Sequence, residues 1–242
     1  MVTLKNRTCV LFGGTGEILR TLVRDMLTEG MNVILVTHNP ETGREMIEEF
    51  AGYPGKLAAV SNHTAYDDLY GKIREEYGSV DVIISKTGGL QEPVPFEEVD
   101  PEQMNRALQQ QVTNVMKNIQ SALPYLKESK AARIVLFSTV GSLSGYEKEN
   151  IIDSVSKGAV NAFTYALARQ LAAYGITVNC VAFSGMMQDH AGVGLDSRNC
   201  LEDIPLGRIG TGEDIAGIVE YLISEEAGFM TGEVIRMAGG LK

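Results

Sequence analysis

The segment TCVLFGGTGEIL (Thr8–Leu19) joins a short apolar run to a glycine-rich turn and the beginning of a helix. In such a strand–turn–helix unit the glycines let the backbone approach a pyrophosphate, which then rests on the amides of the helix N-terminus. The third glycine of the usual spacing is replaced by Leu19, whose side chain would occupy space where helix, strand and phosphates pack. We therefore predict a departure from the usual turn, with a dinucleotide held by Gly13, Gly14, Thr15 and Gly16 if one binds.

Glu17 brings a negative charge to the same turn. A carboxylate within ~5 Å of a phosphate costs roughly 3 kcal/mol at an effective dielectric constant of 20. Two interpretations are open: the side chain points into solvent, or the carboxylate itself satisfies the positive end of the helix dipole.

The alternation of apolar runs with helical patterns continues along the chain. Strands are expected at Thr8–Phe12, Asn32–Thr37, Leu57–Val60, Val80–Ser85, Arg133–Ser138, Thr177–Ala182 and Glu233–Met237, and helices near 16–29, 41–51, 65–77, 101–127, 153–174 and 212–223. Strands that are apolar on both sides and separated by helices form a parallel sheet covered on both faces. We predict one α/β domain over residues 1–242, a Rossmann-type doubly wound parallel sheet of about seven strands.

Composition limits the partners. The 242 residues carry a net charge of −10, which argues against nucleic acid because a phosphate backbone needs a basic face. No apolar run reaches the ~18 residues that span a bilayer, so we expect no membrane segment and a cytoplasmic protein. The three cysteines and three histidines lack metal-ligand spacing, so no metal is expected, and Cys9 and Cys180 lie in apolar runs that predict burial.

Further motifs resemble the short-chain dehydrogenase/reductase family, in particular its ketoacyl-carrier-protein reductases. They are Gly13–Gly16, DVIISKTGG (Asp81–Gly89), RIVLFSTVGS (Arg133–Ser142), SKGAVNAFTYALARQLAAYGITVNCVA (Ser156–Ala182), PLGRIGTGEDIAG (Pro205–Gly217) and FMTGEVIRMAGG (Phe229–Gly240). In order and spacing they cover nearly the whole chain.

The resemblance implies roles for four positions. In the family a tyrosine exchanges the hydroxyl proton, and a lysine four residues later lowers its pKa and holds the nicotinamide ribose. A serine orients the carbonyl, and an asparagine positions a relay water. Lys157 matches the lysine, Thr139 stands for the serine, and Gln111 stands for the asparagine. Asp153 stands where the tyrosine is expected.

An aspartate is a poor substitute for that tyrosine. Ordinary pKa values are ~3.9 for aspartate and ~10 for tyrosine, and a lysine at i+4 favours the ionised carboxylate further. At neutral pH, Asp153 then holds no proton to give, and as a base it is weak because its pKa is far from the operating pH. The alternative interpretation is an ordinary helical ion pair of Asp153 with Lys157, worth ~0.3–0.5 kcal/mol. Tyr146, in the loop after Thr139, is a weaker candidate for a substitute proton donor.

Several residues at the cofactor-binding positions implied by the resemblance also differ from those of the family. The acid that would bind an adenosine ribose falls on Thr37, followed by His38, so any preference would lean toward NADP. The strand-four loop contains Lys86, which either pairs with a phosphate or projects outward. Phe183-Ser184 replaces proline-glycine, and Gln188 replaces a carboxamide-anchoring threonine. The remaining cofactor positions are Asn62, in place of an adenine-contacting aspartate, Gly88 and Lys157.

Three functions are consistent with these residues. The first is a catalytically silent subunit, a pseudoenzyme, that forms a homo- or hetero-oligomer with short-chain dehydrogenase subunits through the helices near 101–127 and 153–174 and the region 212–240. The second is an NAD(P)(H)-dependent oxidoreductase that acts on a carbonyl or alcohol with an altered acid group. The third is a non-redox lyase or isomerase that uses Asp153 and Lys157. The sequence names no small-molecule substrate.

Overall fold

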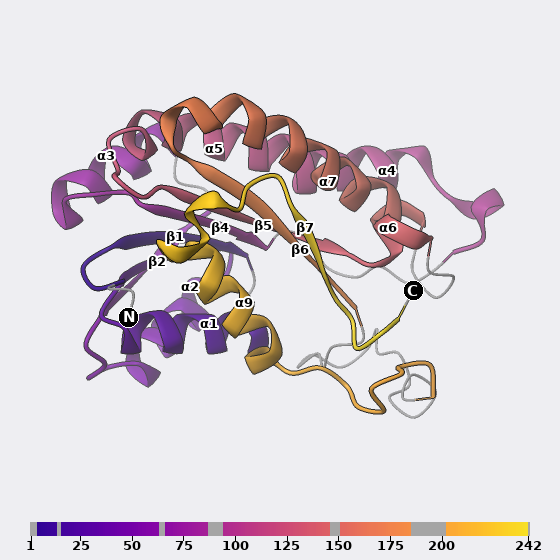
Figure 1. Cartoon of the computed structure of the whole chain (residues 1–242), viewed down its shortest axis with the longest axis horizontal. Coiled ribbons are helices and arrows are strands. Elements are labelled where there is room, and N and C mark those ends of the chain that lie inside the picture. The colour runs from indigo at the N-terminus through magenta and orange to yellow at the C-terminus, as the bar shows by residue number, and fades with distance from the viewer. Residues whose placement is uncertain are drawn as a thin grey trace.

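A computed structural model describes residues 4–13, 16–62, 66–86, 94–145, 151–184 and 202–241 of the chain (Figure 1). Its strands form one parallel sheet in the order β3-β2-β1-β4-β5-β6-β7. Strand order reverses between β1 and β4, so the predicted doubly wound sheet is confirmed. The strands are β1 (Thr8–Gly13), β2 (Asn32–Thr37), β3 (Lys56–Ser61), β4 (Val82–Lys86), β5 (Arg133–Thr139), β6 (Thr177–Phe183) and β7 (Val234–Met237).

Helices cover both faces of the sheet. In Figure 1, α1 (Glu17–Thr28), α2 (Pro40–Glu49) and α9 (Gly212–Ile223) lie below the sheet, and α3 (Tyr66–Tyr77), α5 (Asn114–Leu126) and α7 (Ile151–Leu171) lie above it. Shorter elements are α4 (Pro101–Leu108), α6 (Gly141–Ser144), η1 (Phe96–Glu98), η2 (Gln109–Thr113), η3 (Ala172–Tyr174) and η4 (Glu226–Phe229). The long helix predicted over 101–127 is therefore divided by η2, a π-helical turn.

Each face of the sheet has its own apolar core. Leu11, Leu35 and Ile84 point toward α1 and α9, whereas Val10, Ile34 and Ile83 point toward α3, α5 and α7. Successive strand residues alternate between the two cores, as the pleat requires. The predicted burial of Cys9 and Cys180 is confirmed, since both are fully buried and free.

Because the strands are parallel, their carboxyl ends meet at one edge of the sheet, where Gly13, Lys86, Thr139 and Phe183 end β1, β4, β5 and β6. Sheets of this kind bind ligands at that edge. Within the described ranges, no helix combines the length and apolar character needed to cross a membrane.

Candidate functional site

The first part of the candidate site lies between α7 and the π-helical turn η2. Asp153, in the first turn of α7, is 2% exposed, and Gln111 of η2 is equally buried. The amide Nε2 of Gln111 donates to Oδ1 of Asp153 over 3.3 Å. Ser156 Oγ lies 3.2 Å from Gln111 Oε1 and donates to the carbonyl of Ile152 over 2.7 Å. The carboxylate is thus held in place by a buried amide that is itself bonded.

Lys157 lies one turn further along α7 and is 7% exposed. Its ammonium Nζ donates to the carbonyl of Phe137 over 3.4 Å. Burial, followed by repulsion from Lys86, lowers the pKa of Lys157 from 10.5 to about 8, and the charge of Asp153 opposes that shift. Asp153 and Lys157 are both buried, so the ~0.3–0.5 kcal/mol typical of a solvent-exposed helical ion pair does not describe their interaction.

Thr139 ends β5 beside this helix. Its hydroxyl is buried and has no hydrogen-bond partner among the described residues. The neighbouring Ser138 hydroxyl lies 2.8 Å from that of Ser142, which also accepts from the amide of Asn161 at 2.8 Å. The serine and asparagine network anchors β5 to α7, and Thr139 is left with unused hydrogen-bonding capacity.

Lys86 is mostly buried at the end of β4, and burial lowers its pKa. Its Nζ lies 5.8 Å from the centre of the Phe183 ring, at the end of β6. Phe183 in turn packs edge-to-face on Phe137, with ring centres 5.9 Å apart. The alternative in which Lys86 projects outward was therefore wrong.

The glycine turn shows where space is available. A Cβ on Gly13 would lie 2.3 Å from the carbonyl oxygen of Lys86, so Gly13 is required by the close approach of β1 and β4. A Cβ on Gly16 would meet nothing within 4 Å. Leu19 is 1% exposed in the core, and its Cδ1 lies 3.0 Å from the position of that Gly13 Cβ. Gly14 and Thr15 lie outside the described residues.

Glu17 is the first residue of α1, and its Oε2 is buried without a hydrogen-bond partner among the described residues. The interpretation in which its carboxylate points into solvent was therefore wrong for that oxygen. The carboxylate instead lies beside the positive end of the α1 dipole, as the other interpretation expected.

The residues predicted to contact the adenosine are separate from this cluster. Thr37 is buried, and its hydroxyl accepts from the backbone N–H of Asn39 at 3.1 Å. His38 and Asn62 are exposed. Gly88, Tyr146 and Gln188 lie outside the described residues. The structure brings together Gln111, Asp153 and Lys157, with Thr139 on the adjacent strand.

A model described as "Enoyl-(Acyl carrier protein) reductase" matches residues 18–242. Cyclohexanol dehydrogenase of Rhodococcus sp. is 32% identical over 77% of this chain and 72% of that enzyme. The chain belongs to the short-chain dehydrogenase/reductase family. This is a family of oxidoreductases, and the resemblance seen in the sequence is confirmed.

Other members match along almost their full length. The 3alpha-hydroxysteroid dehydrogenase of Mediterraneibacter gnavus is 29% identical over 99% of this chain and 98% of its own length. The 3-oxoacyl-[acyl-carrier-protein] reductase of Haemophilus influenzae is 28% identical over 98% and 99%. A family member from Mycobacterium ulcerans has the same fold, with a TM-score of 0.90 at 22% identity over 98% of this chain and 90% of that one.

The family's use of a nicotinamide dinucleotide can be tested against these residues. A 3-oxoacyl reductase from Brucella melitensis with bound NAD has a TM-score of 0.87 at 22% identity, over 99% of this chain and 92% of that one. In the present chain Glu17 brings a buried carboxylate oxygen, with no hydrogen-bond partner in the described part of the chain, to the N-terminus of α1, and Leu19 fills the space beside Gly13. An anion at that helix end repels a pyrophosphate. At the start of α1, Glu17 and Leu19 therefore do not fit a dinucleotide.

Sequence reasoning missed two contributors to the site. Ser156 follows Asp153 by three residues, on the same face of α7, and that spacing was the available signal. Asn161 connects α7 to Ser142, and nothing in its sequence context distinguishes it from a surface asparagine. In the part of the chain that the structure describes, no three His, Cys, Asp or Glu side chains cluster as metal ligands.

Proposed function

We propose that this chain is a non-catalytic subunit of an oligomeric short-chain dehydrogenase. The observation that carries the proposal is Asp153, a buried carboxylate bonded to Gln111, at the position four residues before Lys157. A proton donor is required there to quench the alkoxide that forms as a carbonyl is reduced. The positive charge of Lys157 favours the ionised carboxylate, and that form carries no proton for such a transfer.

The hydrogen bond to Gln111 supports the same conclusion. An ionised carboxylate accepts hydrogen bonds only, and the amide donates one to Asp153 from within the protein. That bond stabilises the charged form, which is the wrong form for a general acid. The positions of Glu17 and Leu19 also support the proposal, because both side chains hinder binding of the family's cofactor at the start of α1.

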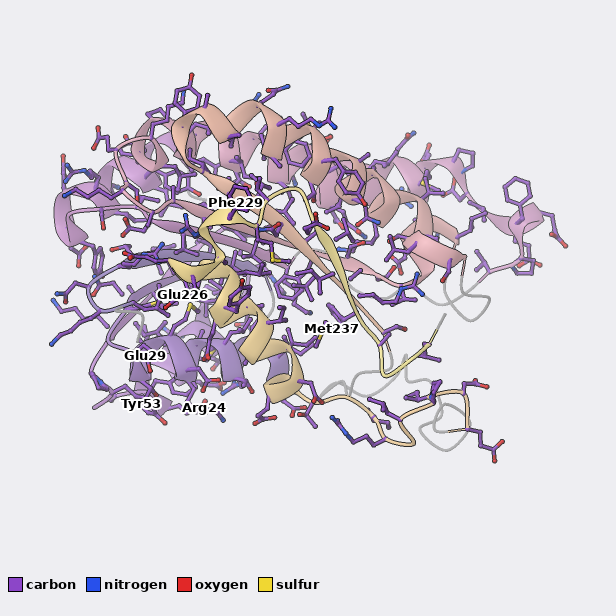
Figure 2. The ribbon with its side chains drawn as sticks, viewed as in Figure 1. Arg24, Glu29, Tyr53, Glu226, Phe229 and Met237 are labelled. Carbon is purple, nitrogen blue, oxygen red and sulfur yellow. The ribbon has the colours of Figure 1, made fainter. Side chains whose placement is uncertain are left out.

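Exposed apolar side chains support assembly with other subunits. On α7, Val155 and Tyr165 are 48% and 47% exposed, and α7 carries apolar residues around much of its circumference. Phe229, in η4 beside the end of α9, is completely exposed (Figure 2). Apolar surface of this kind is typical of an interface with a second copy or a related subunit. We also propose that residues 1–242 form one domain and that the protein works in the cytoplasm, consistent with its free cysteines.

The test is nucleotide binding and turnover by the purified chain. Calorimetric titration with NADH and NADPH is expected to show no binding at nucleotide concentrations of ~1 mM. With a 3-oxoacyl thioester added, nucleotide absorbance at 340 nm is expected to stay constant. The Haemophilus influenzae reductase, in the same assay, verifies the reagents. Micromolar binding together with steady turnover by this chain alone would refute the proposal.

Two variants separate the causes. Glu17→Gln removes the charge at α1 while keeping the side chain's shape, so it is expected to strengthen nucleotide binding at least ~10-fold if repulsion is the obstacle. Asp153→Tyr supplies a proton donor and is expected to yield turnover only in combination with a variant that binds nucleotide. An unchanged affinity in Glu17→Gln would show that Glu17 is not the obstacle.

A second candidate function is an NAD(P)(H)-dependent reductase with an altered acid group. The buried hydroxyl of Thr139, at the carboxyl end of β5 and without a partner among the described residues, favours it, because a free donor at that edge of the sheet suits a carbonyl oxygen. Turnover that is lost in Thr139→Val and retained in Asp153→Asn would establish this alternative.

A further inference from the structure

The side chain of Lys86 extends over the carboxyl end of a neighbouring strand. Lys86 ends β4, and its Nζ lies 5.8 Å from the centre of the Phe183 ring, which belongs to β6. Strand β5 lies between β4 and β6 in the sheet, so the lysine and the ring meet over β5. Thr139 is the last residue of β5. The amine of Lys86 therefore lies close to the end of the strand that carries Thr139.

Lys86, Thr139 and Phe183 share one face of the sheet. Ile84 points into the core beneath α1 and α9, and Lys86 follows it by two residues, so both project from that face. Thr139 and Phe183 are paired residues in the parallel ladder of β5 and β6, and the Phe183 ring packs against the same core. The Thr139 hydroxyl is buried and has no hydrogen-bond partner in the described part of the chain. A hydroxyl with a hydrogen bond to give thus lies on the face from which the amine projects.

The surroundings of Lys86 favour its uncharged amine. Over the ranges that the structure describes, its ammonium group takes part in no ion pair and no side-chain hydrogen bond. Burial lowers the pKa of Lys86. An uncharged lysine amine is a nucleophile, and lysines in apolar surroundings form Schiff bases with carbonyl compounds. The residue keeps part of its surface exposed, so a small molecule can reach the amine.

We propose that the amine of Lys86 forms a Schiff base with an aldehyde or ketone whose oxygen accepts a hydrogen bond from the Thr139 hydroxyl. A carbonyl carbon needs a nucleophile and its oxygen needs a donor, and Lys86 and Thr139 supply these two groups on one face of the sheet. The rings of Phe183 and Phe137, packed edge-to-face with centres 5.9 Å apart, offer apolar contact to the carbon skeleton.

The reaction balances without an oxidant or a reductant. The ammonium group first releases one proton, and the nitrogen lone pair then forms a bond to the carbonyl carbon. A proton moves from nitrogen to the former carbonyl oxygen, which gives a carbinolamine. That oxygen takes up one further proton and leaves as water, and the C=N bond forms. One lysine ammonium and one carbonyl compound thus give one protonated imine and one water, with no hydride transfer and no nucleotide.

The test traps the imine formed with cyclohexanone, a ketone with an apolar ring. The full chain is incubated with cyclohexanone and sodium cyanoborohydride at pH 7, and the labelled lysines are located by peptide mass spectrometry over time. The borohydride reduces the imine to a stable secondary amine, so each label records imine formation. Lys86 is expected to be labelled at least ~10-fold faster than Lys72, an exposed lysine of α3 in the same molecule.

Three variants connect the label with the arrangement of the site. Thr139→Val keeps the shape of the side chain and removes the hydroxyl, so it is expected to slow labelling of Lys86 at least ~10-fold and to leave Lys72 unchanged. Thr139→Ser keeps a hydroxyl and is expected to retain the fast label. Lys86→Arg is expected to lose it. Circular dichroism checks that each variant is folded, and the comparison of Lys86 with Lys72 in the wild type needs no variant.

Three results would each overturn the proposal. They are labelling of Lys86 no faster than that of Lys72, faster labelling of Lys157 than of Lys86, and an undiminished rate in folded Thr139→Val. Because the test contains no nucleotide, its failure is distinct from a failure of the proposed non-catalytic role, which is measured by titration with NADH and NADPH.

Discussion

Replacing Lys157 by methionine should change how the free energy of unfolding depends on pH. In the folded chain the pKa of Lys157 is about 8, lowered chiefly by burial from the ordinary value of 10.5. Each pKa unit corresponds to about 1.36 kcal/mol, so the shift represents about 3 kcal/mol. Methionine has a similar length and no charge, so it removes the titration and keeps most of the packing.

The sign follows from proton binding in the two states. Below pH 8 the lysine is charged in both states, and the folded protein bears the full cost of the buried charge. Between pH 8 and 10.5 the unfolded chain still binds the proton that the folded chain has released, so this group makes stability rise with pH. Above pH 10.5 the cost is gone. The free energy of unfolding of Lys157→Met minus that of the wild type should therefore be about 3 kcal/mol larger at pH 7 than at pH 10.5.

Urea denaturation followed by far-ultraviolet circular dichroism, at half-unit steps from pH 7 to 10.5, measures this difference. Burial raises the pKa of Cys9, Cys180 and Tyr70, which lowers stability at high pH, but these groups are present in both proteins and cancel in the difference. Lys72→Met, an exposed lysine, should give a constant difference. A Lys157→Met difference constant within about 0.5 kcal/mol over this range would refute the burial argument.

Three further predictions concern packing and assembly. Gly13→Ala should destabilise the fold by more than about 2 kcal/mol in urea denaturation, because its Cβ would lie 2.3 Å from the Lys86 carbonyl oxygen. Gly16→Ala should cost less than about 1 kcal/mol, because a Cβ on Gly16 would meet open space. Equal costs for the two variants would contradict this reasoning. Leu19→Ala should lower the free energy of unfolding by about 3 kcal/mol in the same measurement, because Leu19 is buried in the core. A loss below about 1 kcal/mol would show that Leu19 is not a core residue. Phe229→Ser should lower the assembly mass in light scattering while unfolding changes by less than about 0.5 kcal/mol; an unchanged mass would remove Phe229 from the interface.

Most of the fold could be predicted from the sequence, because buried parallel strands are recorded as apolar runs with helical patterns between them. The run Asn32–Thr37 is β2 as expected, and helix 212–223 is α9. The π-helical turn inside 101–127 could not be predicted, because a single helical period fits the apolar residues of that segment. The turn depends on the fit of η2 against α4 and α7, which arises only in the folded chain.

The site was harder to predict because its chemistry depends on burial. Identities at 139, 153 and 157 are plain in the sequence, but an Asp and a Lys four residues apart usually form a solvated pair. Tertiary packing buries both and places Gln111 against Asp153. The orientation of the Lys86 side chain likewise could not be predicted, because the ring of Phe183, which lies near its ammonium group, is nearly a hundred residues away along the chain.

The π-helical turn at Gln109–Thr113 acts as an insertion within a helix. One extra residue in a helical turn rotates everything that follows it by about 100° relative to what precedes it. Deleting a single residue between α4 and α5 would therefore force a choice: either the Gln111 amide keeps facing Asp153, or Ile119 and Ala122 keep facing the sheet. The extra residue of the π-helical turn thus sets the rotation that lets Gln111 face Asp153 while Ile119 and Ala122 face the sheet.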